Sequence, residues 1–181
     1  MSGDAGDAVW AIGGPLGDER RIFAFESDFA ADLRCIPMIV RFKLDRCGIK
    51  LSLRQWAKFG AGNRLLLVSQ RCDTAREIEY YDQKILQLIE TWGGGPVVRL
   101  PIDPEPLWAD PARVPRQVVD QAASTGVAAP TQDRWAGLST LERFALLKLA
   151  RSNHDNDNFA PAMCEFGLVG RIESPRLNLP G

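Results

Sequence analysis

Between residues 33 and 51 the sequence reads LRCIPMIVRFKLDRCGIKL, and this stretch concentrates side chains that could do chemistry. Arginine forks onto phosphates and carboxylates while its stem packs on apolar surface, and lysine supplies a second kind of cation. One interpretation is a surface that binds an anion or a protein partner. The other is a solvated helix face whose charges pair with one another. The candidate contact residues are Arg34, Arg41, Lys43, Asp45 and Lys50.

Thiols offer a second kind of chemistry. The chain has four cysteines, Cys35, Cys47, Cys72 and Cys164, and no C-x-x-C pair, so their spacing does not match a zinc ribbon or a thioredoxin-like site. We therefore expect reduced thiols that pack as small apolar side chains. The alternative is a metal- or redox-binding protein that uses Cys35, Cys47 and Cys164 together with His154.

His154 is the single histidine, so any histidine-based acid–base or metal chemistry has to use it. It stands in the polar run NHDNDN just beyond a helical pattern, where capping of a helix end is its expected role. A further hypothesis places His154 and Arg41 in one pocket between helices, where they would bind a small anionic ligand or substrate.

No catalytic residue can be named from a motif. The GGGP and G-A-G segments do not match a phosphate-binding loop, and the chain has neither G-x-S-x-G nor H-E-x-x-H. These observations favour a protein that is not an enzyme and that carries no cofactor.

Composition narrows the classes of function. With 181 residues, 45% of them hydrophobic, the chain can bury a core of its own. A net charge of −1 argues against a general nucleic-acid binder and a polybasic membrane-surface protein. No segment approaches the roughly 20 apolar residues of a membrane-spanning helix, and the acidic N-terminal residues do not match a secretory signal. We expect a cytoplasmic protein with no nucleic-acid or membrane partner.

Helical spacing predicts the element that positions the charged stretch. A helix is expected from Phe29 to about Arg46, bent or broken at Pro37 and ended by Gly48. Its apolar face would be formed by Leu33, Ile36, Val40 and Leu44.

Capping boxes predict the next two strong helix starts. Ser52 with Gln55 opens a short helix that would bury Leu53, Trp56 and Phe59. The G-A-G segment 60–62 is expected to be a turn, and RLLLVSQ a short helix. Thr74 with Glu77 opens a longer helix, stopped by GGGP at 93–96, whose buried face would include Ile78, Tyr81, Ile85, Leu88 and Trp92.

Proline dominates the middle of the chain. Residues 96–130 are expected to be an ordered strap whose apolar side chains reach the core, with a short helix in RQVVDQAAST. Helices are expected again in STLERFALLKLARS and FAPAMCEFGL. The sum is an all-α bundle of about five to seven mostly short helices. We expect a flexible extension over 1–21, one helical domain over 22–168 and a tail over 169–181.

Two blocks of the sequence resemble a known family. FAFESDFAADLRCIPMIVRFKLDRCGIKLSLRQWAKF (23–59) is similar to the opening block of the nitrate reductase-associated protein family, and RWAGLSTLERFALLKLARSNHDNDNFAPAMCEF (134–166) is similar to its closing block. LPIDPEPLW (100–108) resembles its proline-rich middle. The runs RCIP, RFKLD, GIKL and RFALLKL and the H-x-N-x-N-F that begins at His154 carry the likeness, which spans about residues 22 to 168.

The resemblance implies an association with assimilatory nitrate reductase and with molybdenum-cofactor functions, and it carries over no catalytic residue. The leading hypothesis is a non-enzymatic accessory or maturation factor that contacts nitrate reductase, with the molybdenum-cofactor machinery as a further partner. The basic residues of the charged stretch would make the contact. His154 and Asn158 of the H-x-N-x-N-F run join them as candidate partner- or anion-binding residues.

Overall fold

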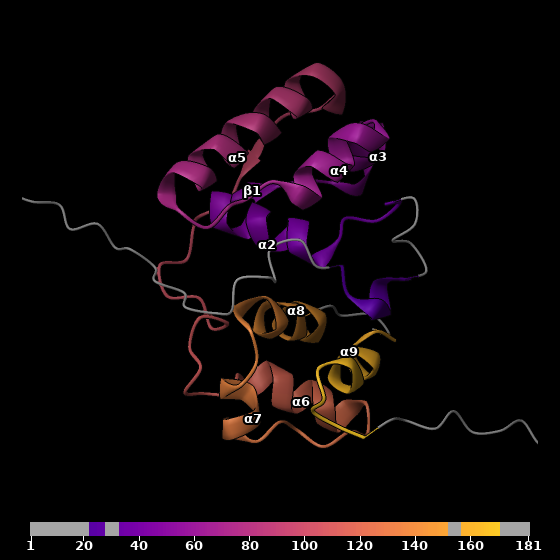
Figure 1. The fold of residues 1–181 in the computed structure, drawn as a ribbon, viewed down its shortest axis with the longest axis vertical. Coiled ribbons are helices and arrows are strands. Elements are labelled where there is room, and N and C mark those ends of the chain that lie inside the picture. The colour runs from indigo at the N-terminus through magenta and orange to yellow at the C-terminus, as the bar shows by residue number, and fades with distance from the viewer. Residues whose placement is uncertain (1–21, 28–32, 152–156, 171–181) are drawn as a thin grey trace, which may run out of the picture. The chain divides into compact units, whose positions relative to one another are not determined.

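The structure, a computed structural model, describes residues 22–27, 33–151 and 157–170. These residues are mostly helical (Figure 1), so the predicted all-α fold class is confirmed. No described helix combines the length and the apolar character that crossing a membrane would require. The α-helices are α2 (Met38–Cys47), α3 (Leu53–Lys58), α4 (Ala61–Ser69), α5 (Ala75–Leu88), α6 (Arg116–Ser124), α7 (Gln132–Ala136), α8 (Thr140–Ala150) and α9 (Phe159–Glu165).

Shorter elements complete the described chain. A 3-10 helix, η2 (Ala24–Glu26), precedes α2, and a π-helical turn, η3 (Ile89–Gly93), continues α5. Strands β1 (Ile49–Lys50) and β2 (Val98–Arg99) pair antiparallel, with Ile49 opposite Arg99.

The chain forms two compact units. One contains the described residues up to Pro106 together with Ser139–Leu141, and the other contains Leu107–Leu138 with the described residues from Glu142 onward. Within the first unit α2 packs against α5 and α4, and in the second α6 packs against α9. The expected single domain over 22–168 stays a prediction, and the expected extension lies outside the described residues.

Helix α2 begins immediately after Pro37, which occupies the N-cap position because its ring fixes φ and offers no N–H to a preceding turn. The carboxylate of Glu26 accepts a hydrogen bond from the backbone N–H of Met38 at 2.8 Å, so an acidic side chain caps the start of the helix. The predicted break at Pro37 is confirmed. The predicted helical face was wrong for Leu33 and Ile36, which are buried but precede the helix, and Leu33 has a φ of 52°.

Gly48 ends α2 as predicted, in the left-handed conformation with a φ of 62°. Its carbonyl accepts a hydrogen bond from Leu100 at 2.8 Å and extends the contact made by β1 and β2. A side chain would not fit here, because a Cβ atom would lie 2.6 Å from the Leu100 oxygen and 2.8 Å from a carbon of Ile102. The end of α2 is thereby held against the segment that follows α5.

Both capping boxes form as predicted. Ser52 and Gln55 cap α3, and Thr74 and Glu77 cap α5. Two of the expected core residues are nevertheless on the surface: Leu53 is 53% exposed and Trp92 is 56% exposed. Residue Leu53 is the first of its helix, and Trp92 lies in the wider π-helical turn, so neither continues the helical stripe on which the prediction rested.

The G-A-G segment is not the expected turn. Gly60 is the N-cap of α4, and Ala61 and Gly62 form its first turn, so the helix starts earlier than RLLLVSQ. The sequence predicts a turn here because glycine disfavours helix interiors, but a helix N-terminus tolerates glycine.

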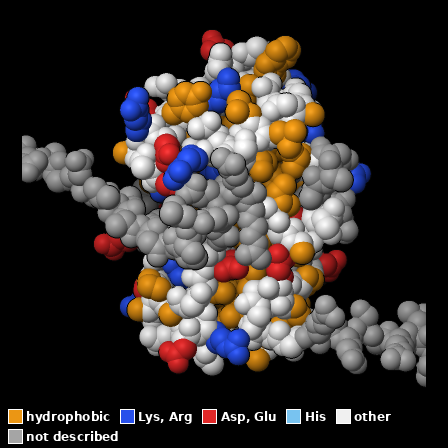
Figure 2. Space-filling view, viewed as in Figure 1, with side chains coloured by type: hydrophobic (Ala, Val, Ile, Leu, Met, Phe, Trp, Pro, Cys, Tyr) orange, Lys and Arg blue, Asp and Glu red, His pale blue; other side chains and the backbone are white. Residues whose placement is uncertain are grey.

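The proline-rich strap is ordered but less buried than expected. Helix α6 forms within it, and Trp108 packs edge-on against Phe144 with ring centroids 6.1 Å apart. The other large apolar side chains before Trp108 are exposed, which corrects the expectation that they reach the core, and Figure 2 shows hydrophobic side chains on the surface of the molecule. They are Val97, Val98, Leu100, Ile102 and Leu107.

Helix α8 is buried around most of its circumference, as its sequence predicts. Arg143 is the polar exception. Its Nε donates to the carbonyl of Trp108 at 2.9 Å and its Nη1 donates to the carbonyl of Leu138 at 2.6 Å. Desolvation lowers the pKa of Arg143. The guanidinium joins Trp108 of the strap to Leu138, which precedes α8, within the second unit.

Candidate functional site

The charged stretch around α2 divides between solvent and core. Arg34, Arg41 and Lys50 are exposed, and Asp45 and Arg46 are half-buried. Lys43 is buried, with an exposed fraction of 2%. The stretch is therefore neither a fully solvated face nor a fully internal network.

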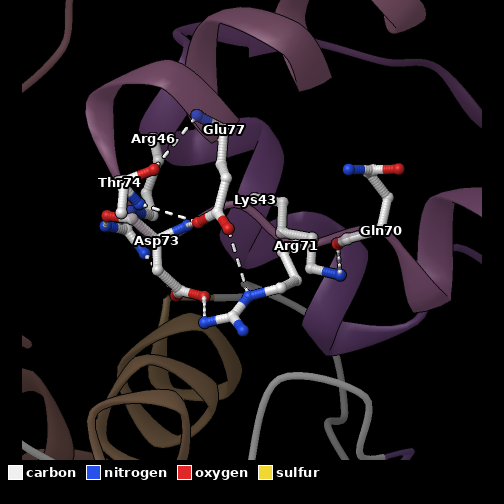
Figure 3. Close-up of polar contacts among 7 residues, drawn as sticks. All are labelled: Lys43, Arg46, Gln70, Arg71, Asp73, Thr74 and Glu77. Carbon is white, nitrogen blue, oxygen red and sulfur yellow. Dashed lines mark hydrogen bonds and ion pairs between the residues drawn. The ribbon is translucent and has the colours of Figure 1, made fainter.

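Lys43 points into the first unit and caps the C-terminal end of α4. Its amine donates to the carbonyl oxygen of Gln70 at 2.6 Å (Figure 3). It also donates to the carbonyl oxygen of Val68 at 2.8 Å and approaches that of Leu67 at 3.4 Å. These carbonyls lie at the C-terminal end of α4, where the last backbone acceptors of a helix have no partner within it and the helix dipole favours a cation. The amine also lies 5.7 Å from the ring centroid of Tyr81, whose hydroxyl donates to Leu67. Lys43 therefore caps the end of α4, and its buried amine does not face a partner protein.

Arg46 joins α2 to the segment before α5 (Figure 3). Its Nη1 lies 3.3 Å from Oδ1 of Asp73, and its Nη2 donates to the backbone oxygen of the same residue at 2.9 Å. Arg71 lies at 3.9 Å from the second carboxylate oxygen of Asp73 and at 3.1 Å from Glu77. The cations and carboxylates alternate, so the network fixes the entry to α5 against α2.

Glu77 belongs both to this network and to the capping box. Its carboxylate accepts hydrogen bonds at 3.0 Å from the backbone N–H groups of Asp73 and Thr74. These bonds stabilise the ionised form, with the bond to Thr74 as the largest cause, and the pKa of Glu77 is lowered from its ordinary value.

Arg41, unlike Lys43, has an exposed side chain. Its Nε donates to the carbonyl oxygen of Ile36 at 3.0 Å, which holds the base of the guanidinium against the turn before α2. Desolvation at this position lowers the pKa of Arg41, and Cys35 and Glu26 act in the opposite direction. Arg41 keeps its charge because an arginine pKa starts far above neutrality.

The metal hypothesis stays a prediction, because His154 lies outside the described residues. All four cysteines are free, and no cluster of His, Cys, Asp and Glu suited to a metal ion occurs among the residues that the structure describes. Cys47 instead lies beside Cys72, whose thiol is the largest cause of a raised pKa at Cys47. Cys72 is not among the site residues predicted from the sequence, because nothing in its local sequence indicates that it lies near Cys47.

The comparisons with known proteins are consistent with the sequence resemblance. The sequence profile of the family described as conserved nitrate reductase-associated protein matches residues 22–166. The chain belongs to this family. No curated protein and no solved structure gives a significant match to it.

The match places the charged stretch inside the family region. It also includes the H-x-N-x-N-F run, of which His154 lies outside the described residues, so its expected cap and its expected pocket with Arg41 stay predictions. Asn158 is half-buried at the N-cap position of α9, where its side chain makes no capping hydrogen bond.

Two structurally important residues differ from the sequence-based prediction. Lys43 is a predicted contact residue, but it follows Ile39 and precedes Cys47 by four residues each, a spacing that puts it on the buried side of α2. Arg143 is not predicted by any sequence pattern, because its partners are backbone carbonyls, one of them the carbonyl of Trp108, 35 residues away.

Proposed function

We propose that this protein is a non-enzymatic accessory factor. It binds an assimilatory, molybdenum-cofactor nitrate reductase by protein–protein contact and supports the maturation or activity of that enzyme. The family description supports an association with nitrate reductase, and the mode of action is our inference.

The observation that carries the proposal is the division of the basic residues. Lys43 and Arg46 are engaged by the protein's own carbonyls and carboxylate, so their charge serves the fold. Arg34, Arg41 and Lys50 are exposed along the same stretch of chain. Exposed arginine and lysine side chains favour contact with an acidic protein surface, where they raise the association rate and select the partner.

A binding experiment with two matched variants tests this contact. The full chain is immobilised, nitrate reductase from the same organism is passed over it, and the bound reductase is quantified at low and at high salt. Arg41→Glu/Lys50→Glu reverses two exposed charges of the candidate surface. Arg54→Glu/Arg76→Glu reverses two exposed charges of the same unit elsewhere. Far-UV circular dichroism verifies that both variants are folded.

We expect the wild-type chain to retain the reductase and to lose it as salt is raised, because salt screens exposed charges. The Arg41→Glu/Lys50→Glu variant should bind at least about tenfold more weakly, and the control variant should bind like the wild type. Failure of the wild-type chain to retain the reductase, together with full nitrate reductase activity in cells that lack the protein, would overturn the proposal.

A further inference from the structure

The guanidinium of Arg41 is held at one edge and open at the other. Its Nε donates a hydrogen bond to the carbonyl oxygen of Ile36 at 3.0 Å. Within the described part of the chain no hydrogen bond or ion pair engages its terminal nitrogens, Nη1 and Nη2, and the side chain is exposed. Because a guanidinium is planar, the hydrogen bond at Nε sets the plane in which Nη1 and Nη2 lie. Arg41 therefore presents these two donors as an oriented fork.

The Ile36 carbonyl belongs to a turn, residues 33–36, that is tied down at its start. Leu33 has a φ of 52°, a conformation that a leucine rarely adopts. Its carbonyl oxygen accepts two hydrogen bonds, one from Nε1 of Trp56 at 2.7 Å and one from Nη1 of Arg64 at 3.2 Å. These donors belong to α3 and α4, so two other helices of the first unit constrain the turn that Arg41 contacts.

The turn is tied down at its other end as well. The carboxylate of Glu26, which is 2% exposed, accepts a hydrogen bond from the backbone N–H of Met38 at 2.8 Å. Arg64 is itself held in place, because its Nε donates to the carbonyl oxygen of Trp56 at 3.2 Å. Ile36 stands between these two anchors, so its carbonyl oxygen and the guanidinium bonded to it have little freedom to move.

We propose that Arg41 binds a carboxylate of the partner protein through Nη1 and Nη2 together, and that Arg64 positions Arg41 through the turn 33–36. The group bound is the side chain of an aspartate or a glutamate, whose two oxygens match the two donors of the fork. A fork that is already oriented loses little side-chain freedom on binding, so more of the interaction energy contributes to affinity. The inference rests on the proposed function, because it names the chemical group of nitrate reductase that this surface would recognise.

Lys50 has no comparable geometry. Its side chain is exposed, and its amine makes no hydrogen bond or ion pair with the residues that the structure describes. An ammonium acts as a compact point charge with rotatable donors, so it does not impose one orientation on a carboxylate. Long-range attraction acts mainly on the association rate, whereas a well-packed, hydrogen-bonded charge pair acts mainly on the dissociation rate. Arg41 and Lys50 should therefore affect different rates of the same binding reaction.

Substitutions that keep the charge separate these two contributions. The full-length protein is immobilised, nitrate reductase from the same organism is passed over it, and both rates are measured at several salt concentrations. Arg41→Lys keeps the positive charge and removes the fork, and Lys50→Arg is the matched control. Arg64→Met removes one donor to the Leu33 carbonyl and is measured alone and combined with Arg41→Lys. Circular dichroism verifies that every variant is folded at the assay temperature.

We expect Arg41→Lys to raise the dissociation rate at least about tenfold, with an association rate and a salt dependence close to those of the wild type, because the charge is unchanged. Lys50→Arg should change neither rate by more than about twofold. Arg64→Met should also raise the dissociation rate. It should have little further effect once residue 41 is lysine, because no fork is then left to position.

Three results would contradict these expectations, and they are distinguishable. If Arg41→Lys dissociates like the wild type, the fork is refuted and the proposed function stands. If Arg64→Met raises the dissociation rate equally with and without Arg41→Lys, Arg64 has only a structural role and its positioning role is refuted. If the wild-type chain does not bind the reductase at all, both the proposed function and this inference fail.

Discussion

The amine of Lys43 lies 2.6 Å from the backbone oxygen of Gln70, the residue that caps the C-terminus of α4. The contact joins the middle of α2 to the end of α4 inside the core of the first unit. A charged side chain is expensive to bury unless hydrogen bonds replace its water, and here backbone carbonyls do so. Replacing Lys43 therefore tests whether this charge of the stretch stabilises the folded protein.

Lys43→Met should destabilise the protein by about 2–4 kcal/mol, because the substitution leaves the buried carbonyls at the end of α4 without their donor. Lys50→Met, an exposed lysine of the same stretch, is the matched control and should change stability by less than about 0.5 kcal/mol. Urea unfolding followed by circular dichroism gives both values. Equal effects of the two variants would refute the capping role of Lys43.

Gly48→Ala should be more damaging than Gly126→Ala. Both glycines have a positive φ, 62° and 70°, so both alanines suffer the strain of the left-handed conformation, roughly 1–2 kcal/mol. Only at Gly48 would the new methyl group also collide with Leu100 and Ile102, whereas Gly126 has no heavy atom within 4 Å of the added Cβ. Thermal unfolding should show the larger loss for Gly48→Ala, and the reverse order would contradict the close packing at the end of α2.

Glu77 should give the protein an acid-sensitive component of stability. Its pKa is lowered in the folded state, so its contribution is present above the unfolded value near 4.5 and is lost as the pH falls through the lower folded value. Glu77→Gln should therefore be less stable than the wild type at pH 7, and the difference should shrink below about pH 4.5. Chemical unfolding at a series of pH values measures this. A difference that stays constant down to strongly acid pH would contradict the assignment.

Arg46 and Asp73 should be energetically coupled. In a double-mutant cycle with Arg46→Met and Asp73→Asn, the two substitutions together should cost about 1 kcal/mol less than the sum of the single costs. The backbone hydrogen bond from Arg46 to residue 73 is lost whenever Arg46 is replaced, both in the wild type and in Asp73→Asn, so it cancels in the cycle. Arg116 and Asp120, a pair with side chains 90% and 66% exposed, provide the control and should show coupling near zero.

The helix ends of this protein could be predicted from its sequence. Ser52, Thr74 and Gly48 act through the few residues beside them, so short sequence patterns are enough to identify helix caps. The same holds for the break at Pro37, which results from the geometry of its own ring.

The direction of the charged side chains could be predicted only in part. The predicted apolar face of Leu33, Ile36, Val40 and Leu44 leaves out Lys43. Lys43 lies four residues after Ile39 and four before Cys47, and all three side chains are buried on the same side of α2. The carbonyl partners of Lys43 lie at the end of another helix, α4, and no local sequence pattern predicts these contacts.

Cys72 illustrates the same limit. It neighbours Cys47 because α2 packs against α5 and brings the segment before α5 to the end of α2. The sequence alone shows four isolated cysteines, since proximity across elements requires knowledge of the packing.

The pairing of β1 with β2 has a consequence for the order of folding. Ile49 lies opposite Arg99, whereas α3, α4 and α5 between them are each stabilised by local hydrogen bonds. Closing this loop costs chain entropy that local helix formation does not, so the helices should form before the ladder closes. Substitutions at the ladder, Gly48→Ala among them, should chiefly accelerate unfolding and leave the refolding rate almost unchanged.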